Sequence, residues 1–255
     1  MKRIIPVLAC LCMLVVQIAF VTDARAQREL IVSAAASLTN AFDEIGKKFE
    51  GAHPGTKVVF NFAASGALLQ QIDQGAPVDV FATADQKTMD QAKEKNLILP
   101  DTRKDFTGNE LVLIVPSAAK VPVATLKDLA GKEIGKLALG NPDTVPAGRY
   151  AREVLTNEGL WDGLQSKLIF GNSVRQVLDY VSRGEVDAGF VFASDTGAAK
   201  DQVKVVQEAK NHKPIAYPIA IVKSSSKQDV AKQFVDFVLS GEGQGVLKKH
   251  GFTKP

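Results

Sequence analysis

Small residues and hydroxyl side chains gather at four places where a predicted strand is followed by a predicted helix. Two of these joints contain Ser37 and Ser65, and two contain Ala147 and Val174. In open α/β sheets, ligands bind at the carboxyl ends of strands, where the next helix begins. Small side chains leave the first N–H groups of a helix uncovered, and these donors, together with the helix dipole, favour a bound anion. The four joints therefore predict an oxyanion site.

Each serine alone is also compatible with an ordinary helix N-cap. The presence of four such joints, two in each half of the chain, favours the binding site. Arg149 and Arg175 follow two of the joints, and we expect them to point to solvent or into surface ion pairs. Neutral donors alone would then hold the anion: at about 1.5–3 kcal/mol each, roughly six hydrogen bonds could offset the desolvation of a dianion. Asp195 is expected to be a helix cap.

Composition and charge restrict the possible functions. The chain has 255 residues, 45% of them hydrophobic and 23% charged, with a formal net charge of +3. Without residues 1–26 it is nearly neutral, so no nucleic-acid partner is expected. Both cysteines, Cys10 and Cys12, lie in that first segment and only three histidines are present. Direct metal ligands, a catalytic cysteine and a resident cofactor are therefore not expected.

Residues 1–26 have the pattern of a secretory signal peptide. A Lys2-Arg3 start precedes an apolar stretch from about residue 4 to 21, and Ala24-Arg25-Ala26 is a small-x-small cleavage signal. Two alternatives are a permanent membrane anchor and a lipoprotein modified at Cys10. Cleavage near Ala26 would release a chain without disulfides, which is typical of a bacterial periplasmic protein.

Short β-branched runs alternate with amphipathic helical stretches, a pattern typical of α/β folds with mostly parallel sheets flanked by helices. Predicted strands lie at 30–32, 58–60, 78–82, 111–115, 137–139, 168–170, 189–192, 203–206 and 219–222. Predicted helices lie near 42–49, 68–72, 85–95, 147–155, 174–181 and 230–238. Because the alternation starts afresh after the run at 109–116 and another crossover is predicted at 215–223, we expect two lobes joined by a hinge. Lobe I would be discontinuous, 27–109 and 221–255, and lobe II would be 110–220.

Several segments together resemble the periplasmic molybdate-binding proteins of molybdate ABC transporters, in the right order over essentially the whole mature chain. They are Ala34 to Phe42, Gly75 to Phe81 with Ala84 to Lys87, Val145 to Ala151, and Gly251 to Lys254. The resemblance implies a two-lobed periplasmic binding protein of type II topology. Such a protein closes over molybdate or tungstate and delivers it to an ABC permease; we expect it to be a monomer and not an enzyme.

The same resemblance implies a role for particular residues. The hydroxyls of Ser37 and Ser65 and the backbone amides of Ala147 and Val174 would hold the oxyanion. The family often adds a tyrosine hydroxyl, but that position is Phe192 here. The missing donor would weaken binding by about 1–3 kcal/mol unless water, another hydroxyl such as that of Tyr217, or a closer approach of the lobes replaces it. Alternatively, Phe192 is simply a core aromatic residue.

Two other functions stay open at the level of the sequence. The ligand could be another tetrahedral oxyanion, such as sulfate, thiosulfate or phosphate. The cleft could also belong to an enzyme such as a phosphate-ester hydrolase or a transferase, although Gly-x-Ser-x-Gly, Gly-x-x-x-x-Gly-Lys and His-Glu-x-x-His motifs are absent from the sequence. The glycines at 241–245 are expected to break the last helix.

Overall fold

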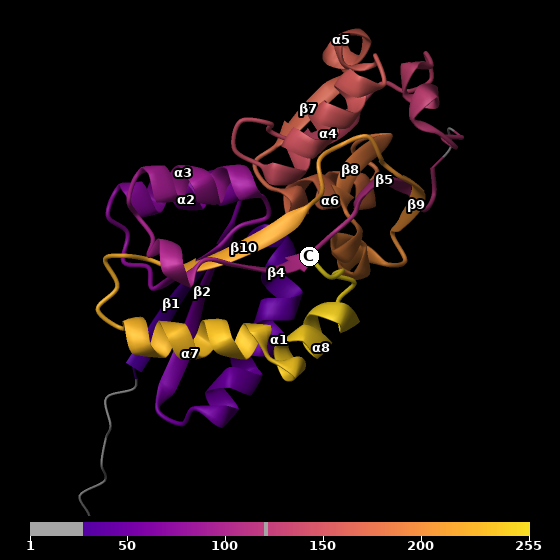
Figure 1. The fold of residues 1–255 in the computed structure, drawn as a ribbon. Helices are drawn as coiled ribbons and strands as arrows, with labels where there is room; N and C mark the ends of the chain where they lie inside the picture. Colours follow the sequence, from indigo (N-terminus) through magenta and orange to yellow (C-terminus); the bar gives the residue numbers. More distant parts are fainter. Residues whose placement is uncertain (1–27, 120–121) are drawn as a thin grey trace, which may run out of the picture.

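The computed structural model describes residues 28–119 and 122–255 (Figure 1). The predicted signal peptide, 1–26, with Cys10 and Cys12, lies outside the described residues. Within the described ranges, no helix is both long enough and apolar enough to cross a membrane.

The first lobe is built on a five-stranded sheet with the order β2-β1-β3-β10-β4. Its strands are β1 (Arg28–Ala35), β2 (Thr56–Ala63), β3 (Val80–Ala82), β4 (Lys104–Gly108) and β10 (Ala216–Ile221). Its helices are α1 (Thr39–Ala52), α2 (Ser65–Asp73), α3 (Gln86–Glu94), α7 (Gln228–Leu239) and α8 (Gly241–Lys249). Helices α2 and α3 cover one face of this sheet, and α1 and α7 cover the other (Figure 1).

Burial on both faces explains why the central strands of this lobe are apolar at successive positions. Val32 and Ala34 of β1 belong to the larger core, where Phe42 and Phe234 join α1 to α7 through an edge-on ring contact. Phe81 of β3 belongs to a separate small core under α2 and α3. The sheet is therefore held between two helical layers.

The second lobe repeats this plan with a sheet of order β7-β6-β8-β5-β9. Its strands are β5 (Leu111–Pro116), β6 (Leu137–Gly140), β7 (Leu168–Gly171), β8 (Ala188–Phe192) and β9 (Val203–Glu208). Its helices are α4 (Pro146–Asn157), α5 (Trp161–Leu164) and α6 (Val174–Ser182). Figure 1 shows β10 and the β4–β5 connection running between the two lobes.

The two-lobed α/β prediction is confirmed, and the sheets are mixed. In each sheet the strands that precede helices pair in parallel, whereas β10 and β5 run antiparallel to both of their neighbours. Both antiparallel strands lie where the chain crosses from one lobe to the other, so their direction reflects the crossover.

One predicted lobe boundary needs correction. The division between residues 220 and 221 cuts through β10, because Ala216–Ile221 pairs with β3 and β4 of the first sheet. The return to the first lobe therefore occurs at the start of the predicted crossover 215–223. The predicted helix break at 241–245 also needs correction, because these residues form the first turns of α8. The interruption lies at Ser240: α7 ends at Leu239, and the Ser240 hydroxyl accepts a hydrogen bond from Gly243 N–H to cap α8.

Candidate oxyanion-binding site

A small cavity lies where the carboxyl ends of strands from both sheets meet. All five positions singled out in the sequence lie on its wall. The lining residues are Ala35, Ala36, Ser37, Ala63, Ala64, Ser65, Ala84, Val145, Pro146, Ala147, Val174 and Phe192. Every one of these side chains is neutral, so an anion in this cavity would be held by dipoles.

Two serine hydroxyls form the polar part of the first-lobe wall. Ser37 follows β1 in a 3₁₀ turn, Ala36–Leu38, and Ser65 is the first residue of α2. They are only 2% and 0% exposed. Neither hydroxyl caps its own helix, so the N-cap alternative is wrong for both. Instead, Ser65 Oγ accepts a hydrogen bond from Ala84 N–H (3.0 Å), and Ser37 Oγ lies 3.0 Å from Tyr217 Oη.

Backbone amides form the polar part of the second-lobe wall. Pro146 begins α4, which places Ala147 in its first turn, and Val174 is the first residue of α6. N–H groups of a first helical turn have no partner within the helix. The Ser173 hydroxyl caps α6 by accepting from Gln176 N–H (3.2 Å) and leaves the Val174 amide uncapped. The two amides add to the dipole of their helix ends.

Phe192 is both a core aromatic residue and part of the cavity wall. It ends β8, is 1% exposed and makes edge-on ring contacts with Tyr150 and Tyr217. It brings no hydroxyl to the site. Tyr217, considered above as a substitute, is not among the residues that line the cavity; its hydroxyl lies behind Ser37.

Direct contacts hold the two lobes together around this cavity. Gly66 N–H of α2 donates to Thr144 O of the second lobe at 3.0 Å. Arg149 Nε of α4 donates to Asp85 Oδ2 at the start of α3, 2.7 Å away. The structure is therefore a closed arrangement of the lobes.

The expectation that both arginines point to solvent or into surface ion pairs is wrong. The Arg149 and Arg175 side chains are 16% and 21% exposed, and their partners Asp85 and Asp195 are 5% and 0% exposed. The approach of the lobes covers Arg149, and the packing of α6 covers the pair that Arg175 makes. Each guanidinium therefore faces a buried carboxylate, and neither lines the cavity.

Asp195 accepts a hydrogen bond at the start of a 3₁₀ helix and also pairs with Arg175. It lies in a 3₁₀ helix, Ala193–Ala199, where Oδ2 accepts from Phe192 N–H (3.3 Å), which agrees with the predicted capping. Its Oδ1 also lies 2.6 Å from Arg175 Nε. Complete burial raises the pKa of Asp195 to about 6, against the opposing charge of Arg175. The carboxylate is thus mainly ionised at neutral pH and balances the arginine.

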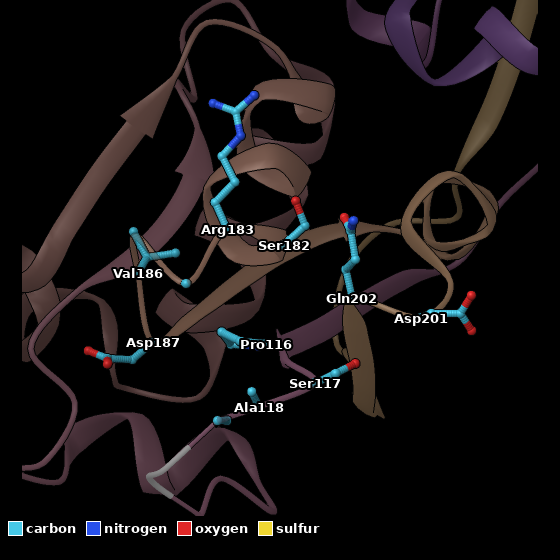
Figure 2. Close-up of a pocket in the computed structure, with 11 residues that line it drawn as sticks. Pro116, Ser117, Ala118, Ser182, Arg183, Val186, Asp187, Asp201 and Gln202 are labelled. Carbon is cyan, nitrogen blue, oxygen red and sulfur yellow. The ribbon is translucent and has the colours of Figure 1, made fainter.

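A second, larger hollow in the second lobe is lined by charged side chains of both signs, among them Arg183, Asp187 and Asp201 (Figure 2). It lies beside Asp187, which precedes β8, whereas Phe192 is at the far end of that strand. The Asp187 carboxylate already accepts from the backbone N–H groups of Gly135 and Lys136. The Arg183 and Asp187 side chains point away from each other (Figure 2). In residues 28–119 and 122–255, no group of three or more His, Cys, Asp or Glu side chains is placed to hold a metal ion.

Two mixed α/β sheets, joined by crossing strands and enclosing a cavity between their strand ends, define the class of two-lobed binding proteins. Comparison with known proteins narrows this class. The family model for bacterial extracellular solute-binding proteins matches residues 30–253, and the chain belongs to this family.

Individual relatives cover almost the whole chain. The molybdate-binding protein ModA of Escherichia coli (strain K12) is 40% identical over 88% of this chain and 89% of its own length. The putative ABC transporter substrate-binding lipoprotein YvgL of Bacillus subtilis (strain 168) is 41% identical over 91% of this chain and 89% of its own. Among solved structures, the periplasmic molybdate-binding protein of Azotobacter vinelandii superposes with a TM-score of 0.79 at 27% identity, covering 89% of this chain and 99% of that one.

Proposed function

We propose that this protein binds molybdate, and also tungstate, between its two lobes and delivers it to the membrane permease of an ABC transporter. It would do so as a periplasmic monomer, after removal of a signal peptide near Ala26, and without a chemical step or a resident cofactor. Its similarity to the molybdate-binding proteins named above supports this assignment.

The observation that carries the proposal is the neutral, donor-rich cavity between the lobes. Its hydroxyls come from Ser37 and Ser65, and its first-turn amides come from Ala147 and Val174. A hydrogen bond to a charged group contributes about 1.5–3 kcal/mol. Because donors converge from two sides, an oxyanion can satisfy them all only when the lobes are closed. Ligand binding and closure would therefore be coupled.

The test removes one hydroxyl at a time. We expect Ser37→Ala and Ser65→Ala each to lower the affinity for molybdate by about tenfold to a hundredfold, measured by calorimetry, because each loses one donor to a charged ligand. Ser182→Ala is the matched control. The Ser182 hydroxyl donates to Asp179 O within α6, away from the cavity. The molybdate affinity of this variant should equal that of the unmodified protein.

Sulfate, phosphate and tungstate titrated under the same conditions identify the ligand class. Tight binding of molybdate and tungstate with weak binding of sulfate and phosphate supports the proposal. Unchanged molybdate affinity in both serine variants, or tighter binding of sulfate than of molybdate, would contradict it.

A further inference from the structure

The hydroxyl of Ser37 can serve an oxyanion only if its proton points into the cavity. A serine hydroxyl has one proton to donate and two lone pairs that accept. Its direction is therefore set by its other neighbour, and for Ser37 Oγ that neighbour is Tyr217 Oη, 3.0 Å away. Distance alone leaves open which of the two oxygens donates.

Asn109, in the connection between β4 and β5, resolves the direction. Its Oδ1 accepts hydrogen bonds from Glu110 N–H (3.0 Å) and Ser194 N–H (3.4 Å). Backbone N–H groups can only donate, so this end of the side-chain amide must be the oxygen. The other end, Nδ2, donates to Ser194 Oγ (2.8 Å) and to Tyr217 Oη (3.1 Å).

Tyr217 Oη therefore accepts from Asn109 and has its own proton left to place. Tyr217 is completely buried, and Ser37 Oγ is the remaining partner within hydrogen-bond distance among the described residues. If Ser37 donated instead, the tyrosine proton would be buried without an acceptor, an unfavourable arrangement. The stable order is Asn109 to Tyr217 to Ser37.

We propose that Tyr217, oriented by Asn109, is a positioning residue that occupies a lone pair of Ser37 Oγ and turns the Ser37 hydroxyl proton into the cavity. This inference rests on the proposed function. Tyr217 acts through Ser37 and does not touch the ligand, because it does not line the cavity.

Ser65 is arranged in the same way by a different donor. Its Oγ accepts from Ala84 N–H (3.0 Å), which leaves its proton for the cavity. Both hydroxyls of the first-lobe wall thus present protons. The two hydroxyls are therefore oriented for an oxyanion that carries no proton, because every oxygen of such a ligand is a hydrogen-bond acceptor.

A double-mutant cycle with molybdate as the probe tests the proposal. We expect Tyr217→Phe to lower the affinity about tenfold, because Ser37 then loses the bond that orients it. In a Ser37→Ala background, the same Tyr217→Phe change should alter the affinity less than twofold. A purely structural role would weaken binding in both backgrounds, so this difference separates positioning from structure.

Tyr150→Phe is the matched control. The Tyr150 ring also contacts Phe192 edge-on, but Tyr150 takes no part in the hydrogen bonds to Ser37 or Asn109. The molybdate affinity of this variant should therefore be unchanged. Should Tyr217→Phe fail to fold, Asn109→Ala tests the preceding bond, with a loss of about threefold that also disappears in the Ser37→Ala background.

Equal losses from Tyr217→Phe with and without Ser37, or no loss in either, would overturn the inference while leaving the binding site intact. Failure of the proposed function has a different signature: Ser37→Ala alone would then leave the molybdate affinity unchanged.

Discussion

The two walls of the cavity offer hydrogen bonds of different origin. On the first-lobe side the donors are the side-chain hydroxyls of Ser37 and Ser65, each fixed by a partner behind it. On the second-lobe side they are peptide N–H groups at the starts of α4 and α6. The first-lobe wall therefore depends on which side chains are present, whereas the second-lobe wall depends on where α4 and α6 begin.

Because of this difference, the donors of the two walls cannot be removed by the same kind of substitution. A hydroxyl is deleted by a change to alanine, whereas a peptide N–H survives almost every substitution. Only proline removes it, and only where the backbone already has a conformation that proline accepts. Three changes test the comparison, beginning with the one expected to have the largest effect.

The first change keeps all donors and prevents the two walls from meeting. In Gly66→Ala the new Cβ would lie 2.7 Å from Thr144 O and 2.9 Å from Thr144 Cα, across the boundary between the lobes. Backbone cannot give way as a flexible side chain can, so the closed arrangement is disfavoured. Overpacking of this kind typically costs about 1–3 kcal/mol, and we expect molybdate affinity to fall about a hundredfold by calorimetry.

Gly51→Ala provides the control for this change. A Cβ at Gly51 meets nothing within 4 Å, although this residue also lies in a helix. Its affinity should be unchanged. Wild-type affinity in Gly66→Ala would show that the lobes do not need this approach to bind the ligand.

The second change removes one amide from the second-lobe wall. Val174 is the first residue of α6, a position that favours proline, and the preceding Ser173 has φ −155° and ψ 164°, which are compatible with a following proline. Val174→Pro should therefore keep the helix while the proline ring replaces both the N–H and the valine side chain. We expect a loss of about thirtyfold in molybdate affinity, equivalent to one charge-assisted hydrogen bond.

Val174→Ala separates the amide from the side chain, since it shortens the apolar group and keeps the N–H. It should bind molybdate within a few-fold of the unmodified protein, with both melting temperatures recorded to verify folding. If alanine and proline weaken binding equally, the Val174 amide is not a donor to the ligand.

The third change gives the second-lobe wall a side-chain hydroxyl. Phe192→Tyr adds the group that the resemblance led us to expect at this position, on a ring that already lines the cavity. We expect molybdate affinity to rise about tenfold, the equivalent of one further hydrogen bond. Competition titrations would measure this gain, and weaker binding would show that the added oxygen only crowds the cavity.

The positions on the cavity wall could be predicted from sequence because they follow a local rule. Strand, small residues and helix start are adjacent in the chain, so the joints at Ser37, Ser65, Ala147 and Val174 are visible without any tertiary information. Phe192 was identified only through the resemblance. No composition or periodicity marks it, since it is one apolar residue in an apolar strand.

The residues behind the cavity wall could not be predicted from the sequence, because their contacts join distant parts of the chain. Asn109 and Tyr217 are separated by 108 positions, and Arg149 and Asp85 by 64. Folding alone brings each pair together, and no local pattern distinguishes an arginine with a buried partner from one at the surface.

The fold shows the same division. Strand β4 was not predicted because Phe106 is its single large apolar residue. The boundary at residue 220 was misplaced because Tyr217 and Ile219 continue one apolar run that could belong to either sheet. Where pairing with a distant strand decided the outcome, the sequence pattern was insufficient.

The two buried ion pairs near the cavity differ in which lobes they join. Arg175 and Asp195 both belong to the second lobe, so their charges cancel whether the lobes are open or closed. Arg149 and Asp85 come from different lobes, so this pair can form only on closure. The Arg149–Asp85 pair would therefore act as a latch, two separate charges while a ligand enters and one neutral contact once the ligand is enclosed.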